Sequence, residues 1–410
     1  MHTTNNRKAL VVGLGIAGMS AAIGLHRAGW TPIIIERAPE RRTGGYFIAL
    51  FPEGRRAATD LGIGDHLHIR DPLGDATTWS VDRRGNRRRS LLGFLDQQGG
   101  PSAVLRGDIE AALWQGISSA GIEVRFATTP REITNNANGV RVQLATTGTA
   151  DRYCEDFDLV VGADGMRSSV RRIVFGPHEE YLTNWEAMIC AFQLPDQVPS
   201  FGPADSIVIA HARRAVWVFG FADRSPTVLL TYRTNNIQEQ FAGSPVDSLR
   251  AAFSGMDHPA VGYALDSLQQ APDYLFDSVH QVKMPRWSTG RVALMGDAGW
   301  CLNLYSGMGA SIGLRAGAEL GAALRQHPDD VAAALDVWET GLRPAVTQHQ
   351  RIARFKQQMF VPSGRTVEVL RPVLLQLLRK LRQRRSPTVL SSGAGPVGHR
   401  TVVHGGTETA

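Results

Sequence analysis

The sequence of 410 residues is poor in cysteine and contains no long apolar run. Its three cysteines, Cys154, Cys190 and Cys301, are far apart, so we expect reduced thiols rather than a disulfide framework or a metal site. No stretch of about 18 uninterrupted apolar residues occurs, so no transmembrane helix is expected. Residues 1–8 are short and polar and do not resemble a signal peptide. We therefore expect a cytoplasmic protein without an integral membrane segment.

Lysine is also scarce, and arginine carries most of the positive charge. The formal net charge is +6, with 43% hydrophobic and 20% charged residues, which is ordinary for a soluble globular enzyme. Arginines cluster at 83–89, around a predicted hairpin tip at Gly85-Asn86, and basic residues cluster again at 379–385. No aromatic residues alternate with these runs, so nucleic-acid binding is not expected. We expect a small-molecule substrate and a chain that is a monomer or a homodimer.

Apolar runs and helical periodicities predict an α/β fold. A strand at 8–13, a helix at 16–28 and a strand at 31–36 form a β-α-β unit with buried parallel strands. A glycine-rich, aromatic loop is expected at 43–52. Alternating strands predict an antiparallel sheet inserted into this α/β domain. The expected parts are the first section of the α/β domain at 1–180, the inserted sheet domain at 181–282, the return to the first domain at 283–345, C-terminal helices at 346–385 and a disordered tail at 386–410.

The first motif, Gly13-Leu14-Gly15-Ile16-Ala17-Gly18, lies between a predicted strand and a predicted helix. In a dinucleotide-binding turn, the first glycine permits the tight turn and the second lets the backbone approach the pyrophosphate. The third lets the helix and strand pack closely. The helix N-terminus offers free N–H groups to the phosphates. Glu36 ends the second strand, where a carboxylate accepts hydrogen bonds from ribose hydroxyls, so these residues predict a bound dinucleotide.

Two later segments also follow apolar strands. Residues 162–172 begin Gly162-Ala163-Asp164-Gly165, and residues 296–311 begin Gly296-Asp297 and include Gly307-Met308-Gly309. Together with the first motif, their order and spacing over about residues 8–345 resemble the class A flavoprotein monooxygenases of the para-hydroxybenzoate hydroxylase type. The resemblance implies a Rossmann-like FAD-binding domain of the GR2 type, an inserted antiparallel β-sheet substrate domain and C-terminal helices. FAD is therefore the expected cofactor, with NADPH or NADH as the reductant.

The resemblance also implies cofactor-binding roles for the residues that match the family motifs. They are Gly13, Gly15, Ile16, Ala17 and Gly18 at the pyrophosphate, Glu36 at the adenosine ribose, Arg37 beside the adenine or its ribose, Arg106 at the phosphates or ribityl chain, Asp164 at both FAD and the reduced pyridine nucleotide, Asp297 at the ribityl chain, and Gly307, Met308 and Gly309 at the flavin pyrimidine ring. From the residues alone, other roles stay open. Arg106 could pair with Asp108 or Glu110, Asp164 could form a turn, and Asp297 could cap a helix.

The third motif departs from the family pattern. The family has a histidine and then a proline at positions that Trp300 and Leu304 occupy here, which puts the details of oxygen activation in doubt. Trp300 could be a flat wall beside the flavin or a core aromatic. The compact architecture resembles family members that act on polyketides and other natural products, including the tetracycline-modifying oxygenases. The Trp-x-Trp-x-Ile-Pro motif of the flavin-dependent halogenases is absent, so halogenation is discounted.

The resemblance implies hydroxylation or epoxidation of an aromatic, polyketide or similar natural-product substrate through a flavin C4a-hydroperoxide. The alternative is a non-redox cyclase of the same fold in polyketide biosynthesis, whose flavin is structural; the altered third motif keeps it open. No catalytic base is identified. Candidate substrate contacts are Tyr46, Phe47, His211, Arg213, Trp217, Phe219, Trp300 and Tyr305.

The segment 365–385 is a predicted basic helix that these motifs do not explain. Its leucines at 370, 374, 377, 378 and 381 share one face, and Pro372 starts or kinks it. One interpretation is docking on a membrane surface. The preferred interpretation is a helix that bridges two domains of its own chain.

Overall fold

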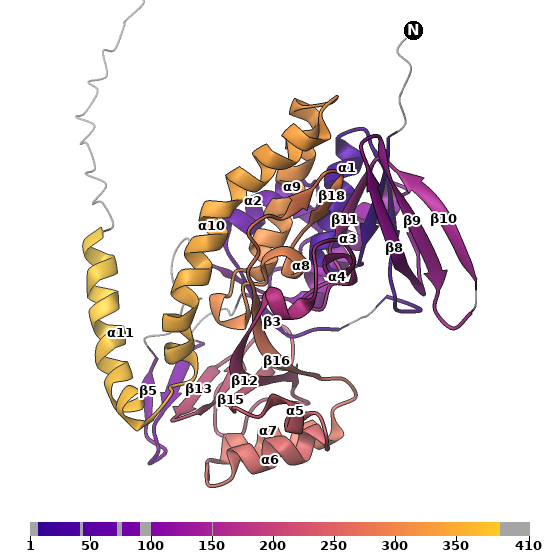
Figure 1. Ribbon diagram of the computed structural model, residues 1–410. Helices are drawn as coiled ribbons and strands as arrows, with labels where there is room; N and C mark the ends of the chain where they lie inside the picture. Colours follow the sequence, from indigo (N-terminus) through magenta and orange to yellow (C-terminus); the bar gives the residue numbers. More distant parts are fainter. Residues whose placement is uncertain (1–6, 42–43, 72–75, 91–99, 150, 386–410) are drawn as a thin grey trace, which may run out of the picture.

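The computed structural model describes residues 7–41, 44–71, 76–90, 100–149 and 151–385 (Figure 1). Its nucleotide-binding part is built on a six-stranded sheet in the order β17-β18-β11-β1-β2-β7. All neighbouring pairs are parallel except β17 with β18. Its strands are β1 (Lys8–Val12), β2 (Thr31–Ile35), β7 (Glu123–Arg125), β11 (Leu159–Gly162), β17 (Ser288–Thr289) and β18 (Val292–Leu294). Because most of these short apolar runs are buried, they form the centre of the largest hydrophobic core.

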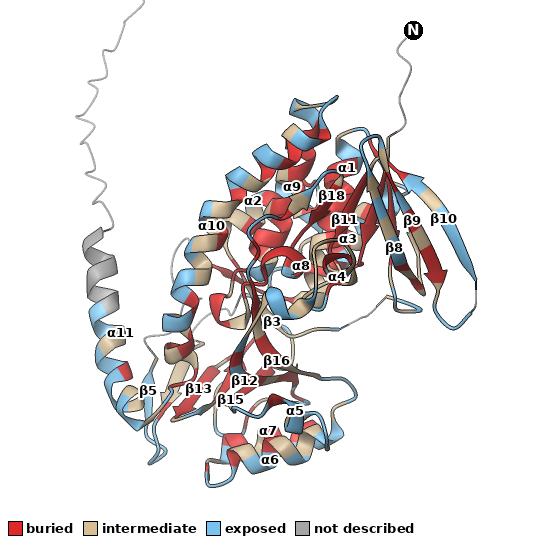
Figure 2. Cartoon of the chain, viewed as in Figure 1, coloured by how far each residue is buried: buried red, intermediate tan, exposed pale blue. Residues whose placement is uncertain are grey.

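Helices and a small sheet surround this core. The helices are α1 (Ile16–Arg27), α2 (Pro52–Asp60), α3 (Arg106–Ser119), α4 (Ser169–Val174), α8 (Asp297–Trp300), α9 (Gly309–Gln326) and α10 (Val331–Phe360), with short 3-10 turns η1 (Gly64–His66), η2 (His178–Glu180) and η3 (Leu304–Ser306). An antiparallel sheet of β8 (Thr128–Asn136), β9 (Gly139–Thr146) and β10 (Arg152–Phe157) flanks the core, as Figure 1 shows. The strands β1, β2, β11 and β18 and the helices α1 and α9 are each buried over more than half of their residues (Figure 2).

A second sheet of seven strands has the order β16-β12-β15-β14-β13-β4-β5. Its strands are β4 (Thr78–Val81), β5 (Arg87–Arg89), β12 (Leu182–Gln193), β13 (Ser206–His211), β14 (Arg214–Phe219), β15 (Thr227–Arg233) and β16 (Leu275–Val282). Its side chains alternate between two hydrophobic clusters. One cluster packs against the helices α6 (Pro245–Phe253) and α7 (Pro259–Gln270), and the other faces the nucleotide-binding part. The short helix α5 (Ile237–Gln240) follows β15.

The fold class predicted from the sequence is confirmed, and several details differ. Residues 47–50, expected within a loop, form β3 (Phe47–Leu50), which pairs with β6 (Ser102–Leu105). The helices α5, α6 and α7 were not predicted, because the strands around them dominate the local pattern. The strands β4 and β5 join the second sheet from outside 181–282, and β4 runs parallel to β13. The β4–β13 pairing joins segments more than 100 residues apart, and no local pattern encodes it.

The chain ends in two long helices. α10 runs from the six-stranded sheet toward the seven-stranded one, and α11 (Arg365–Arg385) lies at the margin of the molecule beside β5 and β13 (Figure 1). Among the described residues, no helix has the length and apolar character needed to cross a bilayer. The expected tail at 386–410 lies outside the described residues.

Candidate active site

Three loops meet at the carboxyl end of the parallel sheet. They follow the neighbouring strands β1, β11 and β18, and they contain the three glycine-rich motifs. A Cβ added at Gly13 would lie 2.6 Å from the Ala163 carbonyl oxygen, and one added at Gly296 would lie 2.7 Å from the Ala17 Cβ. The loops therefore touch one another. Segments nearly 300 residues apart form one site because parallel strands place their carboxyl ends at one edge.

The first loop turns into α1 as a dinucleotide-binding turn requires. Gly13 has a φ of +107°, which disfavours other residues, and a Cβ at Gly18 would lie 1.9 Å from the Gly13 carbonyl oxygen. Gly15 differs, because a Cβ there would meet no described atom within 4 Å. No described side chain caps the N-terminus of α1 at Gly15. Its first N–H groups therefore face open space, which suits an anion that approaches the backbone closely.

A second uncapped helix start lies at the third motif. Gly307 is left-handed with a φ of +70°, and the N–H of Met308 donates to the Ser306 hydroxyl at 3.1 Å. α9 begins at Gly309 with no capping side chain among the described residues, and a Cβ at Gly309 would meet no described atom within 4 Å. α1 and α9 pack directly against each other. The site therefore presents two neighbouring helix N-termini that can stabilise negative charge.

Three polar side chains gather between these helix starts and the second sheet. Asp297 is exposed, yet desolvation by the surrounding protein raises the pKa of its carboxyl, and Arg106 partly opposes this rise. Tyr46 is partly buried, and desolvation raises its pKa, while Arg106 lowers it and Asp297 raises it. Arg106 pairs with the buried Glu110 at 2.7 Å, as one sequence interpretation expected.

Glu36 lies beside the first loop and organises it. Its two carboxylate oxygens accept the N–H groups of Leu14 and Ala38, each at 2.9 Å. Arg37 is exposed next to it. Glu36 therefore stands at the carboxyl end of β2, where the sequence placed it, and it holds the backbone on both sides of that strand end.

Asp164 and Arg171 fix the second loop. Asp164 accepts from Ser169 N and Oγ, both at 2.6 Å, and from Val170 N at 3.2 Å, so it caps α4. The fully buried Arg171 donates to the Ala298 and Met166 carbonyls at 2.7 and 2.6 Å. Burial lowers the pKa of this guanidinium. The sequence analysis missed Arg171 as the link between the second and third motifs, although an arginine inside the motif was a signal for it.

Comparison with known proteins shows which family has this site. A family model described as an FAD binding domain matches residues 6–349. The chain belongs to this family. It is 27% identical over 376 residues to a flavin-dependent monooxygenase of Legionella longbeachae, covering 87% of this chain and 90% of that protein. Tetracycline destructase Tet(51) superposes with a TM-score of 0.73 and 26% identity, covering 93% of this chain and 98% of that one. Klebsiella pneumoniae HpxO, solved with FAD and uric acid, shares the fold with a TM-score of 0.74 and 23% identity, covering 92% of this chain and 94% of that one.

The resemblance to the flavin-dependent monooxygenases is thus confirmed, and the two open helix starts fit FAD. Gly15 leaves room for a pyrophosphate at α1, and Gly309 leaves room for an electron-rich ring at α9. Because α1 and α9 pack against each other, their two starts can hold two different parts of one extended cofactor.

Aromatic side chains line the face of the second sheet that packs against the FAD-binding part of the chain. Phe47 stacks on Phe219 with ring centroids 4.0 Å apart, and Trp217 stacks on Phe360 at 4.4 Å. Tyr305 lies 5.9 Å from Phe360, and its hydroxyl is 3.1 Å from that of Thr231. The predicted contacts Tyr46, Phe47, Trp217, Phe219 and Tyr305 therefore belong to one cluster. The sequence analysis missed Phe360 and Thr231, because nothing in a helix end or an alternating strand distinguishes them.

Three predicted substrate contacts lie elsewhere. His211 is on the face of β13 shared with Ile209, which packs in the cluster beneath α6 and α7. Arg213 is exposed in the β13–β14 turn, where its N–H donates to the Pro362 carbonyl at 2.7 Å. Trp300 packs against Trp287 and Trp338 with centroids 4.3 and 5.8 Å away. The structure thus packs Trp300 among core aromatic residues, which is one of the two interpretations that the sequence left open.

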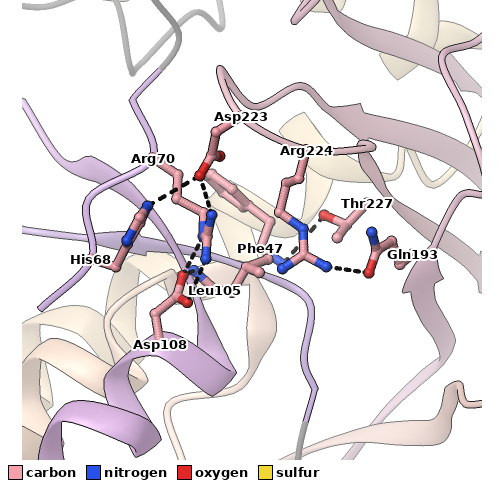
Figure 3. A network of polar contacts seen from close by, with 9 residues as sticks. All are labelled: Phe47, His68, Arg70, Leu105, Asp108, Gln193, Asp223, Arg224 and Thr227. Carbon is pink, nitrogen blue, oxygen red and sulfur yellow. Dashed lines mark hydrogen bonds and ion pairs between the residues drawn. The ribbon is translucent and has the colours of Figure 1, made fainter.

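A polar network unrecognised in the sequence joins the FAD domain to the second sheet (Figure 3). Arg70 donates to both carboxylate oxygens of Asp108, at 2.6 and 2.9 Å, and also pairs with Asp223 after β14. Asp108 in turn accepts the Leu105 N–H at 3.0 Å at the start of α3. Arg70 therefore ties the helix that carries Arg106 to a loop of the second sheet.

Proposed function

We propose that this protein is an FAD-dependent monooxygenase that uses NADPH or NADH and molecular oxygen to hydroxylate or epoxidise an aromatic, polyketide or similar substrate. The observation that carries the proposal is the position of the aromatic cluster next to the open start of α9. Tyr305 belongs to that cluster and is in the turn that leads to Gly307 and Gly309. A flat substrate held beside this cluster would therefore lie near the reactive end of the cofactor.

The residues that we propose to hold FAD are those that match the family motifs, and the geometry supports them. The N–H groups at Gly15, Ile16 and Ala17 would bind the pyrophosphate, Glu36 the ribose, and Arg106 the phosphates or ribityl chain. Asp297 would hydrogen-bond the ribityl chain, and the N–H groups from Gly307 to Gly309 would bind the pyrimidine ring. Asp164 shapes the loop beside Gly13. When bound, FAD supplies the redox chemistry that joins the reduced pyridine nucleotide, oxygen and substrate.

The protein's own contribution is to orient the substrate and exclude water. The cluster consists of buried aromatic and aliphatic side chains, so it desolvates a planar ring. The Tyr305 hydroxyl and Thr231 form its buried polar pair, and burial raises the pKa of Tyr305. A neutral Tyr305 can donate a hydrogen bond to a substrate oxygen. This arrangement suits a phenol or enol whose ring carries few charges.

The altered third motif does not remove this reaction from consideration. Trp300 packs in the core with Trp287 and Trp338, away from the aromatic cluster at the second sheet. The same turn keeps Gly307 and Gly309 at the start of α9. The replacement of the family histidine by Trp300 therefore gives no specific support to the cyclase alternative. The experiment below distinguishes the cyclase from the monooxygenase.

The experiment follows NADPH and NADH oxidation at 340 nm with a panel of planar phenols and polyketides. The products are analysed by mass spectrometry. The proposal expects substrate-dependent oxidation of the nicotinamide and a product that has gained one oxygen atom. A chain that binds FAD and converts a substrate at constant mass, without consuming NADPH or NADH, would be a cyclase.

A matched pair of variants tests the substrate side. Tyr305→Phe removes the hydroxyl next to Thr231, and we expect kcat/KM to fall about fivefold, the equivalent of a hydrogen bond of about 1 kcal/mol. The control is Tyr232→Phe, at the residue next to Thr231 on β15. The Tyr232 side chain packs in the cluster on the opposite face of the sheet, and its hydroxyl donates to the Gln240 side-chain oxygen at 2.7 Å. This control variant should leave kcat/KM unchanged. Equal losses in both variants would argue against the assigned face.

A further inference from the structure

Helix α11 carries an apolar strip that no described part of the chain covers. Val369, Leu370, Val373 and Leu377 are 67%, 57%, 55% and 53% exposed. Their spacing places them on one side of a helix. Four adjacent apolar side chains, each more than half exposed, are unusual on a helix of a soluble enzyme. The strip therefore needs an explanation other than packing against the described residues.

The opposite side of α11 already makes the contacts expected of a bridging helix. Glu368 accepts from Arg83 at 2.6 and 2.7 Å and from the Ala212 N–H at 2.7 Å. Arg371 is buried and donates to the Met359 carbonyl at 2.7 Å. These bonds hold α11 against the β4–β5 hairpin and the end of α10. The strip of α11 thus faces away from the body, as the pale blue parts of the helix in Figure 2 show.

Basic residues surround the strip. The β4–β5 hairpin lies beside the start of α11, where its Arg83 pairs with Glu368 (Figure 1). The same hairpin carries the exposed Arg84, Arg88 and Arg89. Arg365 opens the helix and is also exposed. In sequence, the helix continues through five basic residues between 379 and 385, and Glu368 is its single acidic residue. Apolar residues flanked by cations on one helix are the combination that binds an anionic lipid surface.

A second copy of the chain fits this surface less well. Two α11 helices packed strip to strip would bring their basic residues together, and the carboxylate of Glu368 is already engaged by Arg83 and Ala212. A stable dimer also needs roughly 800 Å² from each partner, which a strip of four side chains does not supply. An anionic bilayer compensates the charge and accepts the apolar side chains at the same time.

We propose that α11 and the β4–β5 hairpin dock the protein on the surface of an anionic lipid bilayer. Val369, Leu370, Val373 and Leu377 insert at the interface, and the arginines of the hairpin contact lipid phosphates. The two sides of α11 then have separate roles, since one contacts the hairpin and the end of α10 and the other contacts the membrane. This docking does not depend on the reaction that the enzyme catalyses.

The test is co-sedimentation of the full chain, with FAD bound, with vesicles of phosphatidylglycerol and phosphatidylcholine or of phosphatidylcholine alone. We expect at least about fivefold more protein on the anionic vesicles. Val373→Glu/Leu377→Glu should lower that binding about fivefold, because it places two charges at the apolar strip. Arg88→Gln/Arg89→Gln should also lower it. The matched control is Tyr153→Glu/Val337→Glu, which makes the same charge change at two exposed apolar residues on β10 and α10.

The outcomes separate the alternatives. Loss of binding in the α11 and hairpin variants, with a control that binds as the natural chain does, supports the proposal. No binding of the natural chain to anionic vesicles overturns it. Equal loss in the control, or a dimer in light scattering that Val373→Glu/Leu377→Glu dissociates, also overturns it. Circular dichroism of each variant confirms that α11 and the fold are intact.

Discussion

The two glycines Gly15 and Gly18 occupy the same turn and should respond differently to alanine. A Cβ at Gly15 meets no described atom within 4 Å, and its φ of −81° and ψ of −178° are open to alanine. A Cβ at Gly18 would lie 1.9 Å from the Gly13 carbonyl oxygen. Gly15→Ala should therefore leave the FAD-free protein as stable as before and block the pyrophosphate. Gly18→Ala should destabilise the FAD-free protein as well.

The size of the effect follows from binding linkage. At an FAD concentration of about 100 times Kd, bound cofactor adds about 2.7 kcal/mol to the free energy of unfolding. If Gly15→Ala binds FAD about 100-fold less tightly, it keeps about 0.4 kcal/mol of that stabilisation. Unfolding entropy of about 2.1 cal/mol/K per residue gives about 0.9 kcal/mol/K for 410 residues. FAD should then raise the Tm of the natural chain by about 3 °C and that of Gly15→Ala by less than about 1 °C.

Scanning calorimetry with and without added FAD, together with FAD titration by fluorescence, measures both quantities. The FAD-free Tm of Gly15→Ala should equal that of the natural chain, whereas the FAD-free Tm of Gly18→Ala should be lower. If Gly15→Ala bound FAD with natural affinity, the pyrophosphate could not lie at the start of α1. An FAD-free Gly15→Ala as unstable as Gly18→Ala would contradict the open space at Gly15.

Three further predictions concern packing, thiols and pH. Gly321→Ala should lower the free energy of unfolding by about 2 kcal/mol in denaturant titration, because its Cβ would lie 2.3 Å from the Gly24 carbonyl oxygen where α9 crosses α1. Gly313→Ala on the same helix has only ordinary contacts from 3.8 Å and should be neutral or stabilising. A thiol reagent at pH 8 should modify the exposed Cys154 alone, since burial raises the pKa of Cys190 to about 12 and that of Cys301 well above its usual value; three thiols reacting at one rate would refute this. The Arg83 guanidinium lowers the pKa of Glu368, so its stabilisation of α11 is present above the ordinary carboxyl pKa of about 4.5 and is lost as pH falls through the lowered value. Hydrogen exchange in α11 should rise over that acidic range in the natural chain; an equal rise in Glu368→Gln would exclude Glu368 as the cause.

Much of the cofactor site was predictable from the sequence, because its determinants are local. Gly13 has a positive φ, and a Cβ at Gly18 would meet the Gly13 carbonyl oxygen, so both of these glycine requirements lie within the turn itself. The buried parallel strands are apolar runs, and each motif follows one of them. The order of three motifs on such strands is enough to specify the family.

The tertiary structure decided what these local patterns leave open. His211 and Trp217 both lie in buried strands, and strand pairing places them on opposite faces of the second sheet. Trp300 became a core residue because Trp287 and Trp338, from distant segments, pack against it. The strip on α11 was visible as a helical pattern, but its exposure depends on which side Glu368 and Arg371 hold against the body. Local sequence determines turns and strands, whereas the partner of each face depends on contacts between residues far apart in the chain.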